Sequence, residues 1–189
     1  MLSRPLRRAA LGALALVVVG VGAAVAGGDI EDKLRTGDAV NVAEGEVVTH
    51  DLYVFGGNVI VDGTVNGDLV AASGSVTING SVDGDVVAGT GELVINGEVA
   101  GDARVGAGRI TVSGTVGEDL LAGAGQLTIQ SGGLVGEDLI FGAGDVRVAG
   151  DVSGSIYGTA STYSRTGSAG SPPVSRVTFS LPPTVPVRE

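Results

Sequence analysis

The chain has 189 residues, of which 34 are glycine, 43% are hydrophobic and none is cysteine, and its formal net charge is −10. These values exclude a disulfide scaffold and a thiolate metal site, and they argue against a nucleic-acid partner, because binding phosphate requires clustered Lys and Arg. Glycine-rich chains are often disordered, but this hydrophobic content is enough for a packed core.

Residues 1–28 have the organisation of a targeting segment. Three arginines precede residue 9, residues 9–28 carry no charge, and the run from Ala24 to Ala26 is a small-x-small cleavage pattern. This order is typical of a secretory signal peptide. The uncharged stretch is also about as long as the ~20 residues that cross a bilayer, so an N-terminal membrane anchor is the alternative. Either form places the rest of the protein outside the cytoplasmic membrane.

An aspartate recurs through the middle of the chain, with successive steps of 17, 17, 17, 17 and 19 residues. These aspartates are Asp51, Asp68, Asp85, Asp102, Asp119 and Asp138. Counted from each of them, apolar residues recur at offsets of 1, 3, 8, 10 and 14. In the second unit these positions hold Leu69, Ala71, Val76, Ile78 and Val82. Self-similarity at a fixed period predicts a solenoid, in which each repeat packs only on its neighbours.

The spacing of two within the apolar groups predicts β-strands rather than helices. Glycine recurs at offset 6, and Asp-Gly, Asn-Gly or Ser-Gly pairs recur at offsets 11 and 12, where we expect turns with a positive φ at glycine. The predicted fold is all-β: a single-stranded, three-sided β-helix over residues 38–160, with three short strands per coil. At about 17 residues per coil and about seven coils, a parallel stack is roughly 33 Å long.

Two flanking segments differ from the repeat. Residues 29–36 are polar, and we expect a short helix there, over the first coil. Residues 161–189 are rich in Ser, Gly and Pro, which predicts a flexible tail. Within the tail, residues 176–181 alternate between polar and apolar side chains, which indicates a strand that caps or flanks the rod.

From Gly67 to Asp85 the sequence reads Gly-Asp-Leu-Val, followed by Gly-x-Val-Thr-Ile-Asn-Gly-x-Val-x-Gly-Asp. This pattern resembles the bactofilin family of polymer-forming cytoskeletal proteins, over roughly residues 38–160. The resemblance implies a right-handed, three-sided β-helix that joins end to end into filaments without nucleotide. Members of the family are typically cytoplasmic, whereas this chain begins with an export or anchor segment.

The aspartate column is the first candidate site. Six stacked carboxylates repel one another, and a cation such as calcium would relieve that repulsion. However, the calcium-binding nonapeptide Gly-Gly-x-Gly-x-Asp does not occur as a tandem repeat, and aspartates at turns commonly accept backbone N–H bonds. We therefore predict that these residues cap turns, with no metal and no cofactor.

The sequence offers little for catalysis. His50 is the only histidine, and no serine stands at a recognisable nucleophile elbow. Adjacent carboxylates such as Glu118 and Asp119 point to opposite faces of a strand and cannot converge on one bond. We predict that the protein is not an enzyme.

A second candidate is the row at offset 2, which points outward if offsets 1 and 3 point inward. The row is largely apolar, with Arg104 as an interruption. The members of this lateral apolar stripe are Tyr53, Val70, Val87, Leu121 and Ile140. An exposed apolar stripe indicates a contact surface. We hypothesise lateral association of the rods, with a membrane surface, a partner chain or coverage by the tail as alternatives.

The expected function is a self-associating structural scaffold at the extracytoplasmic cell envelope. Uncapped solenoid ends expose unpaired backbone groups, which favours end-to-end polymerisation. The residues expected at the two end surfaces are Val40, Val42 and Val48 at one end and Val152, Ile156 and Tyr157 at the other. The expected partners are further copies of the chain and membrane or cell-envelope components, without nucleotide or nucleic acid. The alternative is a monomeric, surface-displayed binding module or adhesin.

Overall fold

The computed structural model describes residues 33–168 and the backbone of residues 175–179. The predicted signal peptide or anchor in residues 1–28 lies outside the described residues, as does most of the predicted tail. Within the described part of the chain, no helix is long and apolar enough to cross a membrane.

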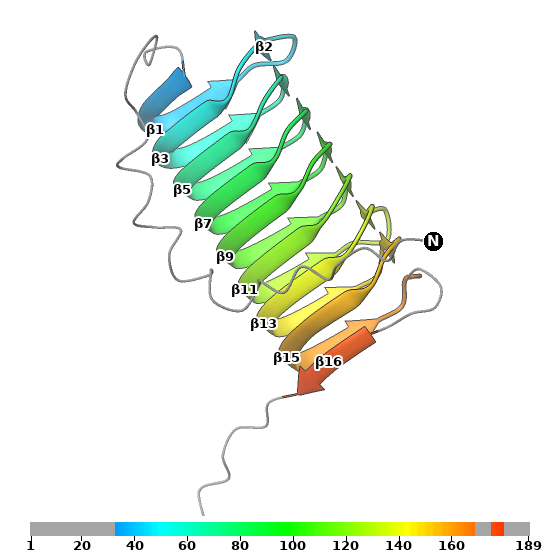
Figure 1. The fold of residues 1–189 in the computed structure, drawn as a ribbon. Coiled ribbons are helices and arrows are strands. Elements are labelled where there is room, and N and C mark those ends of the chain that lie inside the picture. Colours follow the sequence, from blue (N-terminus) through cyan, green and yellow to red (C-terminus); the bar gives the residue numbers. More distant parts are fainter. Residues whose placement is uncertain (1–32, 169–174, 180–189) are drawn as a thin grey trace, which may run out of the picture.

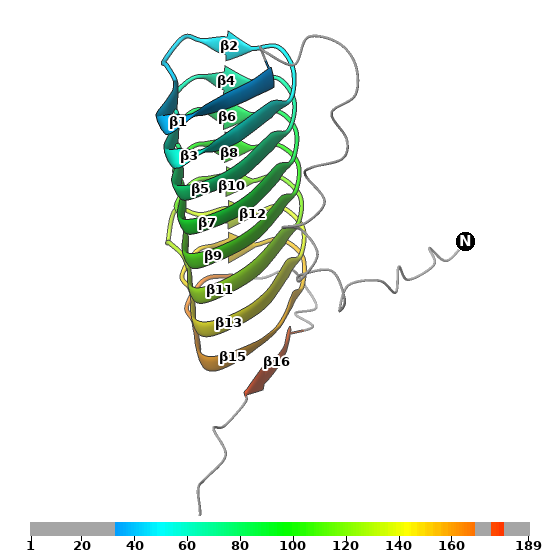
Figure 2. The same ribbon diagram turned by 90° about the vertical axis from the view of Figure 1, so that its left-hand side faces the viewer.

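The described chain winds into a stack of coils, in which long strands alternate with strands of two residues as far as β15 (Figures 1 and 2). The long strands are β1 (Leu34–Val42), β3 (Leu52–Val61), β5 (Leu69–Ile78), β7 (Val86–Ile95), β9 (Ala103–Val112), β11 (Leu120–Ile129), β13 (Leu139–Val148) and β15 (Ile156–Arg165). The short strands are β2 (Val47–Val48), β4 (Thr64–Val65), β6 (Ser81–Val82), β8 (Glu98–Val99), β10 (Thr115–Val116), β12 (Leu134–Val135) and β14 (Asp151–Val152). The eight long strands correspond to eight coils, one more than the sequence predicted.

All of these strands pair in parallel, in two sheets. The first has the order β1-β3-β5-β7-β9-β11-β13-β15-β16, where β16 is Ser175–Phe179, and the second has the order β14-β12-β10-β8-β6-β4-β2. Paired residues are 17 apart in most coils, as for Leu69 and Val86, and 19 apart where the chain has an insertion, as for Leu120 and Leu139. The predicted all-β solenoid with about 17 residues per coil is confirmed.

Each long strand covers two of the three short strands that the sequence predicted for a coil. In β5, residues 1, 3, 8 and 10 of the strand are buried. The step from the third to the eighth residue is odd, so a straight strand would place its two halves on opposite faces. The sheet instead turns a corner, and strand pairing skips Gly74 and Gly91 there, between the pairs Ser73–Thr90 and Ser75–Glu92. The two halves of β5 therefore face the same core.

The glycines of the repeat are required by the approach of neighbouring coils. A Cβ added to Gly91 would lie 2.7 Å from the carbonyl oxygen of Gly74, and one added to Gly97 would overlap the carbonyl oxygen of Gly80. The expected positive φ is wrong for these turns: the two described glycines with a positive φ are Gly37 and Gly45, outside the repeating columns. The glycine columns therefore reflect the stacking distance between coils rather than left-handed backbone.

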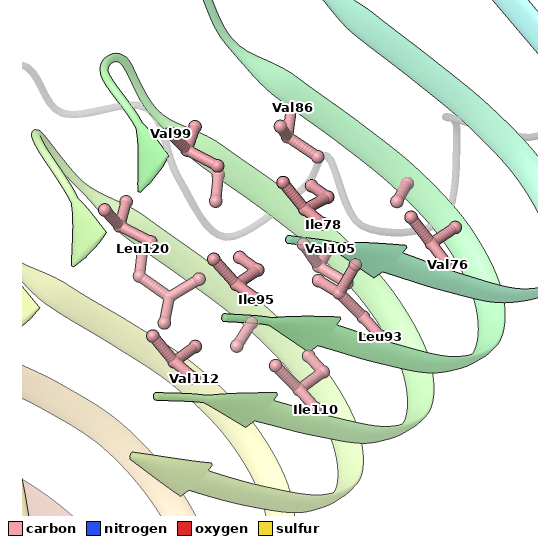
Figure 3. Packing of buried hydrophobic residues seen from close by; sticks show 14 of the residues in the cluster. Val76, Ile78, Val86, Leu93, Ile95, Val99, Val105, Ile110, Val112 and Leu120 are labelled. Atoms are coloured by element: carbon pink, nitrogen blue, oxygen red, sulfur yellow. The ribbon is translucent and has the colours of Figure 1, made fainter. Parts of the chain in front are cut away.

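The core is a continuous column of side chains that are aliphatic apart from Phe141, and no described polar or charged residue is classed as buried. Figure 3 shows how like positions stack between coils, with Val76, Leu93 and Ile110 in one row and Ile78, Ile95 and Val112 in another. Each coil alone would leave these side chains exposed on both of its sides. Its stability therefore comes from burial against the coils before and after it.

Both ends of the rod extend beyond the predicted limits. At the N-terminal end β1 begins at Leu34, so residues 34–36 are strand rather than the expected helix. At the C-terminal end β15 continues to Arg165, so the β-helix runs past residue 160. The alternation in residues 176–181 correctly indicated a strand, because β16 pairs with the first half of β15.

Candidate assembly surfaces

The aspartate column forms a hydrogen-bonded ladder along the rod. Each aspartate accepts, at Oδ1, the backbone N–H of the residue in the same position of the next coil. The bonds run from Asp51 to Asp68, Asp85, Asp102, Asp119, Asp138 and Ser155 in turn, with N···O distances of 2.7–3.1 Å. The carboxylates thus take the place of a backbone acceptor between coils, and the ladder ends at Ser155, whose side chain carries no carboxylate.

A second polar ladder lies at offset 11. The amide of Asn79 donates to Asp62 at 2.7 Å, the amide of Asn96 donates to Asn79 at 2.8 Å, and the hydroxyl of Ser113 donates to Asn96 at 2.7 Å. These side chains are stacked by the strict period, so each donor meets an acceptor one coil away. The sequence predicted only turns at these residues, although their identical offset was the signal of the ladder.

Arg104 carries the charge on the lateral apolar stripe. Its guanidinium donates to Asp85 at 2.8 Å and to Asp102 at 2.5 Å. The hydrogen bond from Arg104, together with the backbone N–H of Asp102, holds the pKa of Asp85 below its ordinary value. The contact with Asp85 in turn raises the pKa of Arg104. Arg104, the one charged residue in this row, is therefore paired with carboxylates of the neighbouring aspartate ladder.

The lateral apolar stripe lies at the second position of the long strands, on the outer face. The register places its members in direct sequence across the sheet: Tyr53, Val70, Val87, Arg104, Leu121, Ile140 and Tyr157. The apolar members from Tyr53 to Ile140 are half-buried, because each packs against its neighbours in the row, while Tyr157 is 38% exposed. The row therefore forms one ridge over seven strands that is apolar or aromatic except at Arg104.

At the N-terminal end the expected residues form the first layer of the core. Val42 is fully buried, Val40 is 7% exposed and Val48 is 4% exposed. The loop between β1 and β2 is held by an ion pair between Arg35 and Glu46 at 2.6 Å, and Arg35 lowers the pKa of that carboxyl. Within the described chain, β1 and β2 are the end strands of the two sheets.

At the C-terminal end the expected residues are covered more than the sequence suggested. Val152 and Ile156 are buried, and Ile156 and Tyr157 pair with Ser175 and Arg176 of β16. The edge of the large sheet therefore lies one strand further out than predicted. The short strand β14 ends the second sheet within the described residues.

The last coil also differs in the side chains that it presents to the core. Tyr163 and Arg165 occupy the eighth and tenth positions of β15, where other coils have aliphatic residues. The Tyr163 ring stacks on Phe141, with centroids 6.0 Å apart and an interplanar angle of 12°. Its hydroxyl is buried without a partner among the described residues, and burial raises its pKa. The signal for this difference in the sequence is the departure of Tyr163 and Arg165 from the apolar offsets.

The residues considered for catalysis are dispersed. Nδ1 of His50 lies 3.0 Å from the carbonyl oxygen of Asp51, and Oδ1 of Asp119 is occupied by the ladder. Over residues 33–168, no group of three or more potential ligands is placed to hold a metal ion.

No protein-family model, no curated protein and no solved structure matches the chain.

Proposed function

We propose that this protein is a self-associating structural scaffold, similar to the bactofilins, in which rods join end to end. The observation that carries the proposal is the arrangement of the sheet edges. Among the described strands, β1 and β2 at one end and β16 and β14 at the other have a neighbour on one side only. Such edges present unpaired N–H and C=O groups to another chain, but at β14 the Val152 N–H already donates to the carbonyl oxygen of Ser168 at 3.1 Å.

The end layers support the addition of a further coil. Val40, Val42 and Val48 form an apolar layer beneath β1 and β2 that continues three of the aliphatic rows of the core, whereas Arg35 pairs with Val54 and stands at the end of another row. Another rod therefore extends both the sheets and the core when its last strands pair here. Strand pairing of this kind uses only backbone groups and apolar contact, so the proposed assembly needs no nucleotide.

The proposed location is the extracytoplasmic cell envelope. It rests on the order of basic residues, uncharged segment and cleavage pattern within residues 1–28. A retained anchor would attach the filaments to the membrane, and a cleaved signal would release them among cell-envelope components. These surroundings supply the further partners that we propose beside the chain itself.

A monomeric binding module or adhesin is the second candidate. It is favoured by the last coil, where Tyr163 and Arg165 replace aliphatic core residues and where β16 pairs with half of β15. Polar or aromatic residues in a terminal repeat are typical of a cap that ends a solenoid. A capped end would leave the rod as a monomer that displays its faces.

The test is negative-stain electron microscopy of the full chain, with sedimentation, over a range of protein and salt concentrations. Filaments whose width matches one or a few rods are expected. The Val47→Lys variant is expected to remain short, because lysine on an edge strand blocks further pairing. Val47 is 53% exposed in β2, so this change spares the core.

The matched control is Leu134→Lys. Leu134 is 37% exposed and lies in the same column as Val47, but in β12, which has neighbours on both sides. This variant is expected to form filaments like the unaltered chain. Monomeric rods at every concentration of the unaltered chain would refute the scaffold and favour the binding module.

A further inference from the structure

Two rows of contrasting size run side by side on the outer face of the large sheet. One is the apolar ridge already described, from Tyr53 to Tyr157, at the second position of the long strands. The other lies at the fourth position and is called here the glycine row. Its members are Ala72, Gly89, Gly106, Gly123 and Gly142, and the same row ends in Phe55 of β3 and Thr159 of β15. Between these two ends, bulky side chains stand next to a strip with almost no side chains.

The glycines of this row have no explanation within the rod. A Cβ added to Gly89 or Gly106 would meet nothing within 4 Å, and one added to Gly142 would meet only the Thr159 hydroxyl, at 3.9 Å. These positions differ from the corner column, where Gly91 is confined by Gly74 of the coil before. Glycine weakens a strand, and inside a strand it often marks the close approach of another chain.

We propose that a second copy of the chain packs on this face, with the two rods parallel and pointing in the same direction. A two-fold axis along the rods, between the two rows, places the ridge of each copy over the glycine row of the other. Val87 then lies on the partner's Gly89, and Leu121 lies on the partner's Gly123. The contact is isologous, because the same pairs occur twice.

The opposite orientation fits the same face poorly. A two-fold axis along the strands would place ridge against ridge and leave the two glycine rows facing an empty gap. It would also bring the two aspartate ladders together, with Asp102 opposite the partner's Asp102. In the parallel arrangement each ladder lies beyond the outer side of its ridge and faces the partner's corner glycines. Arg104 stays neutralised by its own Asp85 and Asp102.

The size of the face predicts a weak contact for isolated rods. The part of the ridge that faces small residues runs from Val70 to Ile140, which is four coil spacings or roughly 19 Å, and it is only a few residues wide. This is smaller than the ~800 Å² per partner of a standard interface. We therefore expect a concentration-dependent dimer, which becomes stable when several rods are linked in a row. The pairing itself does not depend on end-to-end assembly.

The first test is disulfide trapping, which is clean because the chain has no cysteine. Full-length Val87→Cys and Gly89→Cys chains are mixed and oxidised, and a covalent dimer is expected that neither chain forms efficiently alone. Efficient trapping of Val87→Cys with Leu121→Cys instead would overturn the parallel orientation. Thr77→Cys with Val94→Cys, in a row on the second half of the long strands, reports random collisions. A yield no higher than this background would overturn the pairing.

The second test fills the glycine row. Gly106→Val adds side-chain atoms where the rod leaves open space, so its melting temperature should be unchanged or higher, since β-branched residues favour strands. The added bulk prevents close approach, and the yield of the Val87–Gly89 cross-link should fall roughly tenfold. An unchanged yield in a folded variant would contradict the proposal.

Both tests are repeated with Val47→Lys in the background. If this change abolishes filaments but the cross-link persists, lateral pairing and end-to-end assembly are separate properties. Loss of the cross-link together with the filaments would show that the face pairs only within filaments, and would overturn the independent dimer.

Discussion

The carboxylate of Asp119 accepts the backbone N–H of Asp138 at 2.8 Å across a step of 19 residues. The same contact joins Asp85 to Asp102 at 3.0 Å across 17 residues. The two additional residues lie between β11 and β12, where they do not alter the register of the long strands. The ladder is thus maintained by the position in the coil rather than by the distance along the chain.

Replacement of Asp119 tests the ladder. Asp119→Ala leaves the Asp138 N–H without its acceptor, and we expect the free energy of unfolding to fall by about 1–2 kcal/mol. Asp119→Asn keeps an oxygen in the same place and should recover most of this loss. Chemical denaturation measures the stability, and amide hydrogen exchange at Asp138 reports the bond itself. Equal losses in both variants would show that the charge, rather than the acceptor, is what stabilises the coil.

Gly97 and Gly89 distinguish glycines that are required by the close approach of two coils from glycines that are not. Gly97→Ala places a Cβ against the carbonyl oxygen of Gly80, and this overpacking should cost about 1–3 kcal/mol. Gly89→Ala meets no atom within 4 Å and should be neutral or stabilising by up to about 1 kcal/mol. Thermal or denaturant unfolding of the two variants provides the comparison. A similar loss in both would contradict the assignment of Gly97 to coil contact.

The solenoid was predictable because the apolar residues that form its core recur at the same offsets as the repeat itself. Every apolar offset recurs in each full coil, so the sequence alone indicated which residues stack, and the core contains those residues. The corner within each long strand was not predicted. A run such as Ala72 to Gly74 has the composition of a turn, and only the register shows that pairing continues around it.

The features of the surface were harder to predict from the sequence than the core. The position of the stripe followed from the alternation of side chains along each strand. The neighbouring glycine row can accept a partner chain only because there is open space above Gly89 and Gly106, and the sequence does not show that space. Periodicity cannot distinguish such a glycine from one confined by stacking, such as Gly91. Likewise, the contacts of Arg104 with Asp85 and Asp102 join residues 19 and 2 positions away, which no repeat pattern specifies.

The Arg104–Asp85 pair predicts a dependence of stability on pH. Arg104 lowers the pKa of Asp85 in the folded chain relative to an unfolded value of about 3.9. The pair therefore stabilises the fold above about pH 4, and this contribution is lost as the pH falls through the lowered pKa. Because both side chains are more than a third exposed, Arg104→Gln should cost only about 0.5–1 kcal/mol at pH 7.

Denaturant unfolding of the unaltered chain and of Arg104→Gln, measured from neutral to acid pH, checks this prediction. The difference between the two curves should be largest at neutral pH and should close in acid, after Asp85 has taken up its proton. A difference that stays constant with pH would assign the effect of Arg104 to packing of its aliphatic stem.

Phe141 and Gly158 are complementary in size at the C-terminal end of the core. The third position of the long strands holds small or medium residues in the other coils, whereas β13 has Phe141 there. Its ring occupies the space above Gly158, where an added Cβ would lie 2.5 Å from the ring. Gly158→Ala should therefore cost about 1–3 kcal/mol by overpacking, and Phe141→Ala should cost about 3–5 kcal/mol by leaving a cavity and losing the stack on Tyr163.

The double variant decides whether the two residues act as one packing unit. When the ring is absent, the methyl group of Ala at position 158 has room and fills part of the cavity. The combined loss of unfolding free energy should then be smaller than the sum of the single losses, by about 0.5–3 kcal/mol. Additive losses would show that the ring and the glycine are independent. In the coupled case, Phe141, Gly158 and the stacked Tyr163 form the packing that closes the last coil, and β16 pairs along the outer edge of that coil.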